Sequence, residues 1–186
     1  MKSKYHTISL LFSTILLSLG VNAAPTITFQ GEVTSQTCSV DINGSTDSVV
    51  LLPTVGMAEF GNPLAGGQTA GLTPFTVSVT GCIAPKSVDQ KINTTFLGYD
   101  VDSASGVMGN RSSSSNAASG IGIQLTTSGS GGTPVILKGA TSVPGLVLNA
   151  GKTSTSYDFG VRYYVLKASA MPGSITAVAE YTLSYL

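Results

Sequence analysis

Apolar and polar residues alternate in short runs along most of this chain. The longest run lies at the C-terminal end, where Ile175, Ala177 and Ala179 begin an apolar series that alternates with mostly polar residues as far as residue 185. Alternation with a period of two places one set of side chains on a single face of a β-strand. The other runs are rich in β-branched residues and are bounded by turn residues, which is typical of strands. The pattern predicts nine strands, at residues 27–33, 37–42, 48–55, 72–80, 92–98, 121–126, 134–137, 156–166 and 175–185.

No stretch keeps apolar residues at helical spacing for three turns, so helices are not expected. Nine short strands at irregular spacing favour an all-β fold, an immunoglobulin-like β-sandwich. Two stretches, residues 102–120 and 127–133, are rich in Gly and Ser and are predicted to be loops with too little apolar surface to pack. We interpret them as solvated connectors; a variable, surface-exposed face is the alternative.

The first 23 residues have the three parts of a secretory signal peptide. Lys2 and Lys4 precede an apolar run at residues 8–19, and Val21 and Ala23 are the small residues of a cleavage site. A membrane anchor is the alternative, but a spanning helix needs roughly 20 apolar residues. Cleavage after Ala23 leaves residues 24–186 as a single exported domain.

Composition argues against several functions of the mature part. Without Lys2 and Lys4 it carries seven basic and nine acidic residues, and it lacks the clustered Lys and Arg that nucleic acid requires. The sole histidine, His6, lies in the signal peptide, so the commonest general base and metal ligand is missing. No serine lies in a Gly-x-Ser-x-Gly elbow with a plausible base. We predict no enzymatic activity, cofactor or metal; a carboxylate pair brought together in space for glycoside chemistry stays open.

The two cysteines, Cys38 and Cys82, both belong to the mature part. Export to an oxidising compartment makes a single disulfide the expected state, with two buried free thiols as the alternative.

Both ends of the mature chain carry alternating apolar strands. At the N-terminal end Ile27, Phe29 and Val33 alternate with polar residues. An apolar strand at a free end can add to the sheet edge of a neighbour. The alternative at each end is an ordinary first or last strand of a complete sandwich.

Several motifs resemble those of chaperone–usher pilins, and among them the F17-like major fimbrial subunits. The similar segments are Thr-Phe-Gln-Gly-Glu-Val at residues 28–33, Thr-Cys-Ser-Val at 37–40, Leu-Pro-Thr-Val at 52–55, Gly-Leu-Thr-Pro-Phe at 71–75 and Gly-Cys at 81–82. The family's C-terminal pattern is a penultimate aromatic residue, apolar residues at the fourth, sixth and eighth places from the end, and glycine at the fourteenth. Those places hold Tyr185, Leu183, Tyr181, Ala179 and Gly173.

The resemblance implies an immunoglobulin-like sandwich that lacks its last strand and exposes an apolar groove. A periplasmic chaperone would fill this groove, and an outer-membrane usher would then exchange the chaperone's strand for the N-terminal segment of the next subunit. Ile27 and Phe29, in a donor segment at residues 24–33, would supply the donor side chains. The acceptor groove and chaperone contact would include Gly173, Ala179, Tyr181, Leu183 and Tyr185.

The chain departs from the family in having about four residues between the predicted cut and the motif at residues 28–33. The donor segment must therefore be short or include residues up to Val33, and its register stays open. The resemblance implies a structural subunit of a surface fimbria that polymerises head-to-tail and supports adhesion. A minor or adaptor pilin, and a secreted β-sandwich that binds carbohydrate, are the alternatives.

Overall fold

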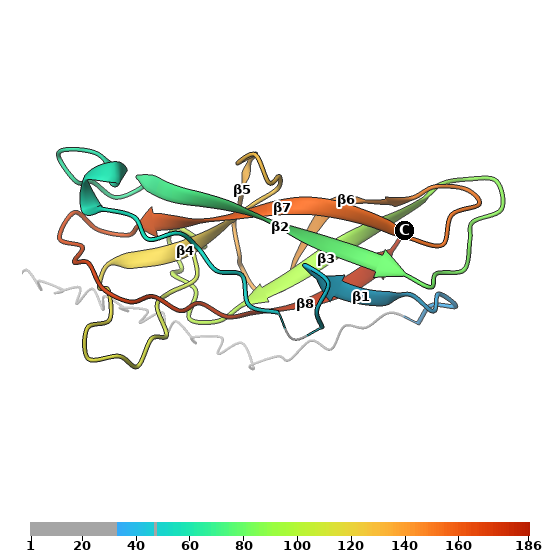
Figure 1. Cartoon of the computed structure of the whole chain (residues 1–186), viewed down its shortest axis with the longest axis horizontal. Coiled ribbons are helices and arrows are strands. Elements are labelled where there is room, and N and C mark those ends of the chain that lie inside the picture. Colours follow the sequence, from blue (N-terminus) through green and yellow to red (C-terminus); the bar gives the residue numbers. More distant parts are fainter. Residues whose placement is uncertain (1–32, 47) are drawn as a thin grey trace, which may run out of the picture. The chain divides into compact units, whose positions relative to one another are not determined.

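The computed structural model describes residues 33–46 and 48–186, so the predicted signal peptide, Ile27 and Phe29 lie outside the described residues. The described part consists of strands and one short 3-10 helix (Figure 1). In chain order these are β1 (Ser39–Ile42), η1 (Met57–Phe60), β2 (Thr69–Thr80), β3 (Gln90–Gly98), β4 (Ile121–Thr126), β5 (Pro134–Val135), β6 (Thr141–Leu148), β7 (Thr155–Val165) and β8 (Ala179–Tyr185). Within this part of the chain no helix is long and apolar enough to cross a membrane.

The strands form two antiparallel sheets. One has the order β1-β2-β7-β4-β5, and the other has the order β6-β3-β8. The long central pairing joins β2 to β7 with Phe75 opposite Phe159, and β3 pairs with β8 with Phe96 opposite Tyr181. The all-β sandwich predicted from the alternating pattern is therefore present.

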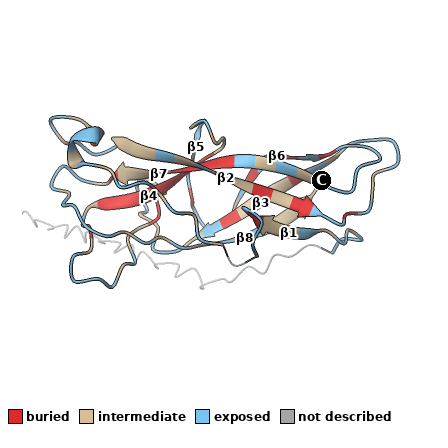
Figure 2. Ribbon diagram, viewed as in Figure 1, coloured by how far each residue is buried: buried red, intermediate tan, exposed pale blue. Residues whose placement is uncertain are grey.

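The core lies between the inner faces of the two sheets. Phe75 and Phe159 from one sheet meet Phe96 from the other, with ring centroids 5.4–6.3 Å apart. Alternate residues such as Val77 on β2 and Ile92 on β3 are fully buried around them. Burial is complete along β4 and alternates along β2 and β3 (Figure 2), as expected for a sandwich whose strands alternate inward and outward residues.

Two strand predictions differ from the structure. Residues 48–55 form no ladder with the described strands, although their side chains alternate as in a strand. Conversely, β6 was not predicted, because Pro144 and Gly145 interrupt its sequence. The ladder with β3 shifts register at this point, and a side chain at residue 145 would clash with the Tyr157 ring, 2.5 Å from its Cδ1 atom. A proline and a glycine are tolerated here because the strand bulges at the edge of its sheet.

The prediction that residues 102–120 are a solvated connector is wrong, whereas residues 127–133 form a loop with no buried residue, as predicted. Val107, Met108 and Ala118 in the longer loop are buried. The shorter loop folds onto the sheet, where the Gly129 amide donates to the Asp158 carbonyl at 2.9 Å and Gly160 leaves room beneath it. Composition failed for the longer loop because it packs through backbone contacts and a few apolar residues.

A disulfide joins Cys38, just before β1, to Cys82, just after β2. The Gln36 side chain reinforces this junction, since it accepts from the Ile83 amide at 3.1 Å and donates to the Ile83 carbonyl at 3.4 Å. The segment that leads into β1 is thereby fastened to the turn after β2.

Replacing both Cys38 and Cys82 with Ser should lower the free energy of unfolding by about 4 kcal/mol, because the disulfide closes a loop of 44 residues. Pulse proteolysis in urea measures this change, and Ser39→Ala, at an exposed neighbouring position, is the matched control. An unchanged urea midpoint in the double variant would contradict the prediction.

Candidate functional site

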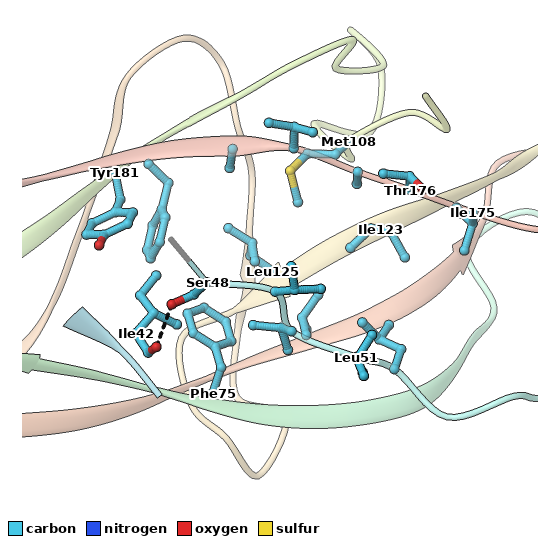
Figure 3. Close-up of a pocket in the computed structure, with 18 of the residues that line it drawn as sticks. Ile42, Ser48, Leu51, Phe75, Met108, Ile123, Leu125, Ile175, Thr176 and Tyr181 are labelled. Atoms are coloured by element: carbon cyan, nitrogen blue, oxygen red, sulfur yellow. Dashed lines mark hydrogen bonds between the residues drawn. The ribbon is translucent and has the colours of Figure 1, made fainter. Parts of the chain in front are cut away.

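An apolar groove opens between the two sheets, with a volume of about 540 Å³. Its two walls are extended segments, residues 48–52 on one side and residues 175–181 on the other (Figure 3). The floor consists of core residues from both sheets. The lining residues are Ile42, Ser48, Val49, Val50, Leu51, Leu52, Phe75, Phe96, Met108, Ile123, Leu125, Val161, Tyr163, Ile175, Thr176, Ala177, Val178, Ala179 and Tyr181. The groove therefore gives access to the centre of the hydrophobic core.

The wall that precedes β8 is paired along one edge by the long loop after β3. The bonds involve the backbone groups of alternate residues, 174, 176 and 178. They run from the Ala118 amide to the Ser174 carbonyl at 2.8 Å, from the Ser174 amide to the Asn116 carbonyl at 3.0 Å, from the Arg111 amide to the Thr176 carbonyl at 2.7 Å and from the Tyr99 amide to the Val178 carbonyl at 3.0 Å. Backbone groups of successive residues in an extended chain point to opposite edges, so Ile175 and Ala177 direct theirs to the other edge.

The Asn110 side chain holds this pairing together. Its Nδ2 donates to the carbonyls of Ala118 and Ser174, both at 2.9 Å. Its Oδ1 accepts from the amides of Ser112 at 2.9 Å and Thr176 at 3.0 Å. One amide side chain thus makes four hydrogen bonds that join the loop to the groove wall, which is the full capacity of its two donors and two lone pairs.

The opposite wall, residues 48–52, is held by side chains. The Ser48 hydroxyl donates to the Ile42 carbonyl at 2.6 Å (Figure 3). Further along the same segment, the Tyr163 hydroxyl donates to the Pro53 carbonyl at 3.1 Å. Burial raises the pKa of the Tyr163 phenol above its ordinary value. Val50 and Leu52 pack against the core.

Four of the predicted acceptor residues lie along one wall, but only two of them line the groove itself. Ala179 and Tyr181 line the groove. Leu183 and Tyr185 continue the same face of β8 and pack, half-buried, against the main core. In the described ladders β8 pairs with β3 along one edge and is the last strand of its sheet.

Gly173 lies beyond the end of the groove, in a second cavity of about 300 Å³. The two cavities share Tyr163 and Ile175. A Cβ atom at residue 173 would lie 2.1 Å from the Asn116 carbonyl oxygen and 2.6 Å from the Ala118 nitrogen, at a φ of 158°. Glycine is therefore required here for the loop and the groove wall to approach closely.

The sequence did not identify Met108, the groove wall at 48–52 or Asn110 as parts of the site. Met108 lies in a Gly- and Ser-rich stretch with no periodic pattern, so nothing in the sequence marks it as buried. The segment 48–55 was predicted to be a strand, and its alternation is consistent with a groove wall. Ile175 and Ala177 were on the predicted core face, and both line the groove.

The chemistry of the lining favours apolar side chains as ligands. No carboxylate, amine or guanidinium group is among the described lining residues, and their polar groups are hydroxyls and backbone. No group of three or more potential metal ligands occurs in residues 33–46 and 48–186. A long groove with apolar walls and a backbone edge can accept an extended peptide segment that inserts alternate side chains.

Comparisons with known proteins agree with this geometry. The family model described as "Fimbrial protein" matches residues 27–186. The chain is 35% identical to the major fimbrial subunit SMF-1 of Stenotrophomonas maltophilia, over 90% of this chain and 96% of that one. It is 35% identical to the F17 fimbrial protein of Escherichia coli, over 86% of each chain. It is 31% identical to the minor fimbrial subunit HifD of Haemophilus influenzae, over 86% of this chain and 73% of that one.

Solved structures resemble the fold. A subunit in the structure of a chaperone–usher pilus superposes with a TM-score of 0.56 at 16% identity, covering 88% of this chain and 96% of that one. The P pilus rod subunit PapA gives a TM-score of 0.56 at 17% identity, covering 80% of this chain and 99% of that one. These likenesses show an immunoglobulin-like fold.

Replacing Asn110 with Ala should loosen the groove wall, because four hydrogen bonds are lost, each worth about 0.5–1.5 kcal/mol. We expect hydrogen exchange of the Thr176 and Ala118 amides to become at least about tenfold faster, which corresponds to about 1.4 kcal/mol. Ser115→Ala, at an exposed position of the same loop, is the control. Equal protection in the Asn110→Ala variant and the parent would contradict this role.

Proposed function

Because this chain belongs to the fimbrial protein family, the structural and non-enzymatic subunits of chaperone–usher pili, we propose that it is the major subunit of a fimbrial rod that polymerises by donor-strand exchange. Each subunit would accept a strand from the next subunit in its groove and donate its own N-terminal segment to another. The resulting fibre would support adhesion of the cell.

The observation that carries the proposal is the groove itself. Buried core residues such as Phe75, Phe96 and Val161 line its floor between two extended walls. Backbone groups of Ile175 and Ala177 point to the groove edge, where a donor strand can form a ladder with them. An open apolar groove with an unprotected strand edge favours aggregation unless a partner covers it.

The donor would be the segment at residues 24–33. Ile27 and Phe29 alternate with Thr26 and Thr28, so in an extended donor strand they would share one face and could enter the groove together. Burying a Phe side chain contributes roughly 1.5–3 kcal/mol. Several such side chains, together with the ladder bonds, would hold the donor strand in place.

The partners before assembly would be a periplasmic chaperone and an outer-membrane usher. The chaperone would cover the same groove with a strand of its own, in contact with Gly173, Ala179, Tyr181, Leu183 and Tyr185. The predicted signal peptide, residues 1–23, would direct export, and residues 24–186 would form the single pilin domain. The assembled subunit would belong to a fimbria on the cell surface.

A minor or adaptor subunit is the second candidate, because the minor subunit HifD is among the relatives. We rank it second because the major subunit SMF-1 is 35% identical to the chain and HifD is 31% identical. The apolar lining of the groove gives no support to the carbohydrate-binding alternative, since sugar recognition requires polar partners.

Phe29→Asp should abolish polymers and leave the chaperone complex intact, because it removes the apolar contact and adds the cost of burying a charge. A pull-down with tagged chaperone and a heat-stable ladder on a gel measure the two outcomes. Thr28→Asp, on the opposite face of the same segment, is the matched control and should still polymerise. Loss of chaperone binding in Phe29→Asp, or long polymers from it, would show that the donor strand lies elsewhere.

Tyr185→Ser should lower the amount of chaperone complex as well as the polymer ladder, because chaperone and donor strand would use the same groove and Tyr185 packs beside it. The same pull-down and gel measure both. Normal chaperone capture by this variant would separate Tyr185 from the acceptor surface.

Without a chaperone, the exported chain should aggregate or be degraded, because its groove would remain uncovered. Fractionation of cells that express the chain with and without its chaperone measures this. A stable soluble monomer obtained without the chaperone would argue that the groove is already filled within the chain.

A further inference from the structure

The two ends of the sandwich carry different surfaces. We call the segment that leads into β1, residues 33–38, the arm. The end of the sandwich beside it, the arm end, consists of the loops at residues 81–89 and 149–154 (Figure 1). The far end includes η1 and residues 166–174. Hydrogen bonds from Cys82 to Thr153 at 3.0 Å and from Gly151 to Pro85 at 2.8 Å hold the two loops of the arm end together. The two loops of the arm end are therefore fixed relative to each other.

Exposed apolar residues lie at both ends. At the arm end Ile83 is 52% exposed and Val88 is 76% exposed. At the far end Met171 is 63% exposed. The arm-end loops carry Lys86, Asp89 and Lys152, and the far end carries Glu59 and Lys167, so each end has charges of both signs. The two ends thus offer exposed apolar side chains to each other, which suits contact between copies.

The arm is attached to the arm-end loops at Gln36 and Cys38. Gln36 makes two hydrogen bonds to the backbone of Ile83, and the Cys38–Cys82 disulfide follows directly. The chain that leads to the proposed donor strand therefore leaves the domain beside Ile83. When the donor strand binds a neighbouring subunit, the surface around Ile83 must therefore lie close to that neighbour, at a distance set by the chain between the donor residues and Gln36.

That length is short. Phe29 and Gln36 are seven positions apart, which corresponds to at most about 24 Å when the chain is fully extended. If Phe29 lies beside Ala177 in the neighbour's groove, a donor strand entering at the far end passes Gly173 first, a distance of about 13 Å over four residues. About 10 Å then remains between the anchored Gln36 and the mouth of the groove. Two facing layers of side chains fill such a gap.

The end of the groove at which the donor strand enters follows from the need to repeat the same contact along the fibre. The arm leaves at the arm end, and a head-to-tail contact repeats along a fibre when two different surfaces of the subunit meet. The donor strand of one subunit therefore enters the far end of the next. It runs antiparallel to β8, which itself runs from the far end to the arm end.

We propose that consecutive subunits share a second interface, in which Ile83 and Val88 at the arm end of one copy pack against the surface around Met171 at the far end of its neighbour. This inference rests on the proposed donor-strand exchange and adds a contact outside the groove. The donor strand holds two subunits together, and the end-to-end contact limits how far they bend relative to each other.

Cross-linking in assembled fibres tests this interface. Chains with Val88→Cys and chains with Met171→Cys are co-expressed, their fibres are treated with a short bismaleimide, and the subunits are separated on a denaturing gel. We expect a covalent dimer when both variants are present and none from either variant alone. The control pairs Val88→Cys with Leu97→Cys, an exposed position on the outer face of β3, and should give no dimer.

The outcomes distinguish the two proposals. Fibres that form but give no covalent dimer overturn the end-to-end interface and leave donor-strand exchange intact. A dimer from Val88→Cys alone means that like ends meet, which also overturns it. Failure of the parent chain to form a heat-stable ladder overturns donor-strand exchange, and the interface with it.

Fibre stiffness gives an independent measurement. Val88→Asp should keep the heat-stable ladder, because the groove is untouched, but should lower the persistence length of fibres in electron micrographs several-fold. Fibres as stiff as those of the parent would overturn the interface.

Discussion

The groove depends on hydrogen bonding along one edge of the C-terminal segment. Residues 174, 176 and 178 bond to the loop after β3, and β8 continues the same edge along β3 itself. This pairing fixes the backbone of Ile175 and Ala177 with their polar groups toward the groove. Because the alternate side chains then face the core, the wall presents both a ladder edge and an apolar surface. The proposed donor strand uses both features.

Close approach between backbones makes this pairing feasible. Gly173 allows the C-terminal segment to pass within contact distance of residues 116–118. Gly98, at the end of β3, likewise leaves room for Val101, Met108 and Leu137 side chains. The buried Met108 then reaches the floor of the groove from a loop. These glycines allow the loop to pack where a side chain would force it away from the wall.

The sequence predicted the features that depend on local alternation. The all-β sandwich, most strand positions and the inward face of residues 175–185 follow from a period of two, and the comparisons confirm the resemblance to chaperone–usher pilins. The sequence did not predict β6, because the bulge at Gly145 breaks its alternation. It also missed the packed loop at residues 99–120, whose order comes from Asn110 and from backbone contacts with distant residues. Such long-range bonds leave no periodic trace in a sequence.

The long loop also sets the length of the binding surface. β8 alone has seven residues, which give a wall of about 24 Å. Pairing by residues 110–118 extends the ordered wall back to Ser174, and this adds Ile175 and Ala177 to the positions available to a donor strand. Since donor side chains on one face repeat about every 7 Å, the extension adds about two contacts. A loop with the composition of a solvated connector therefore contributes directly to the strength with which one subunit would hold the next.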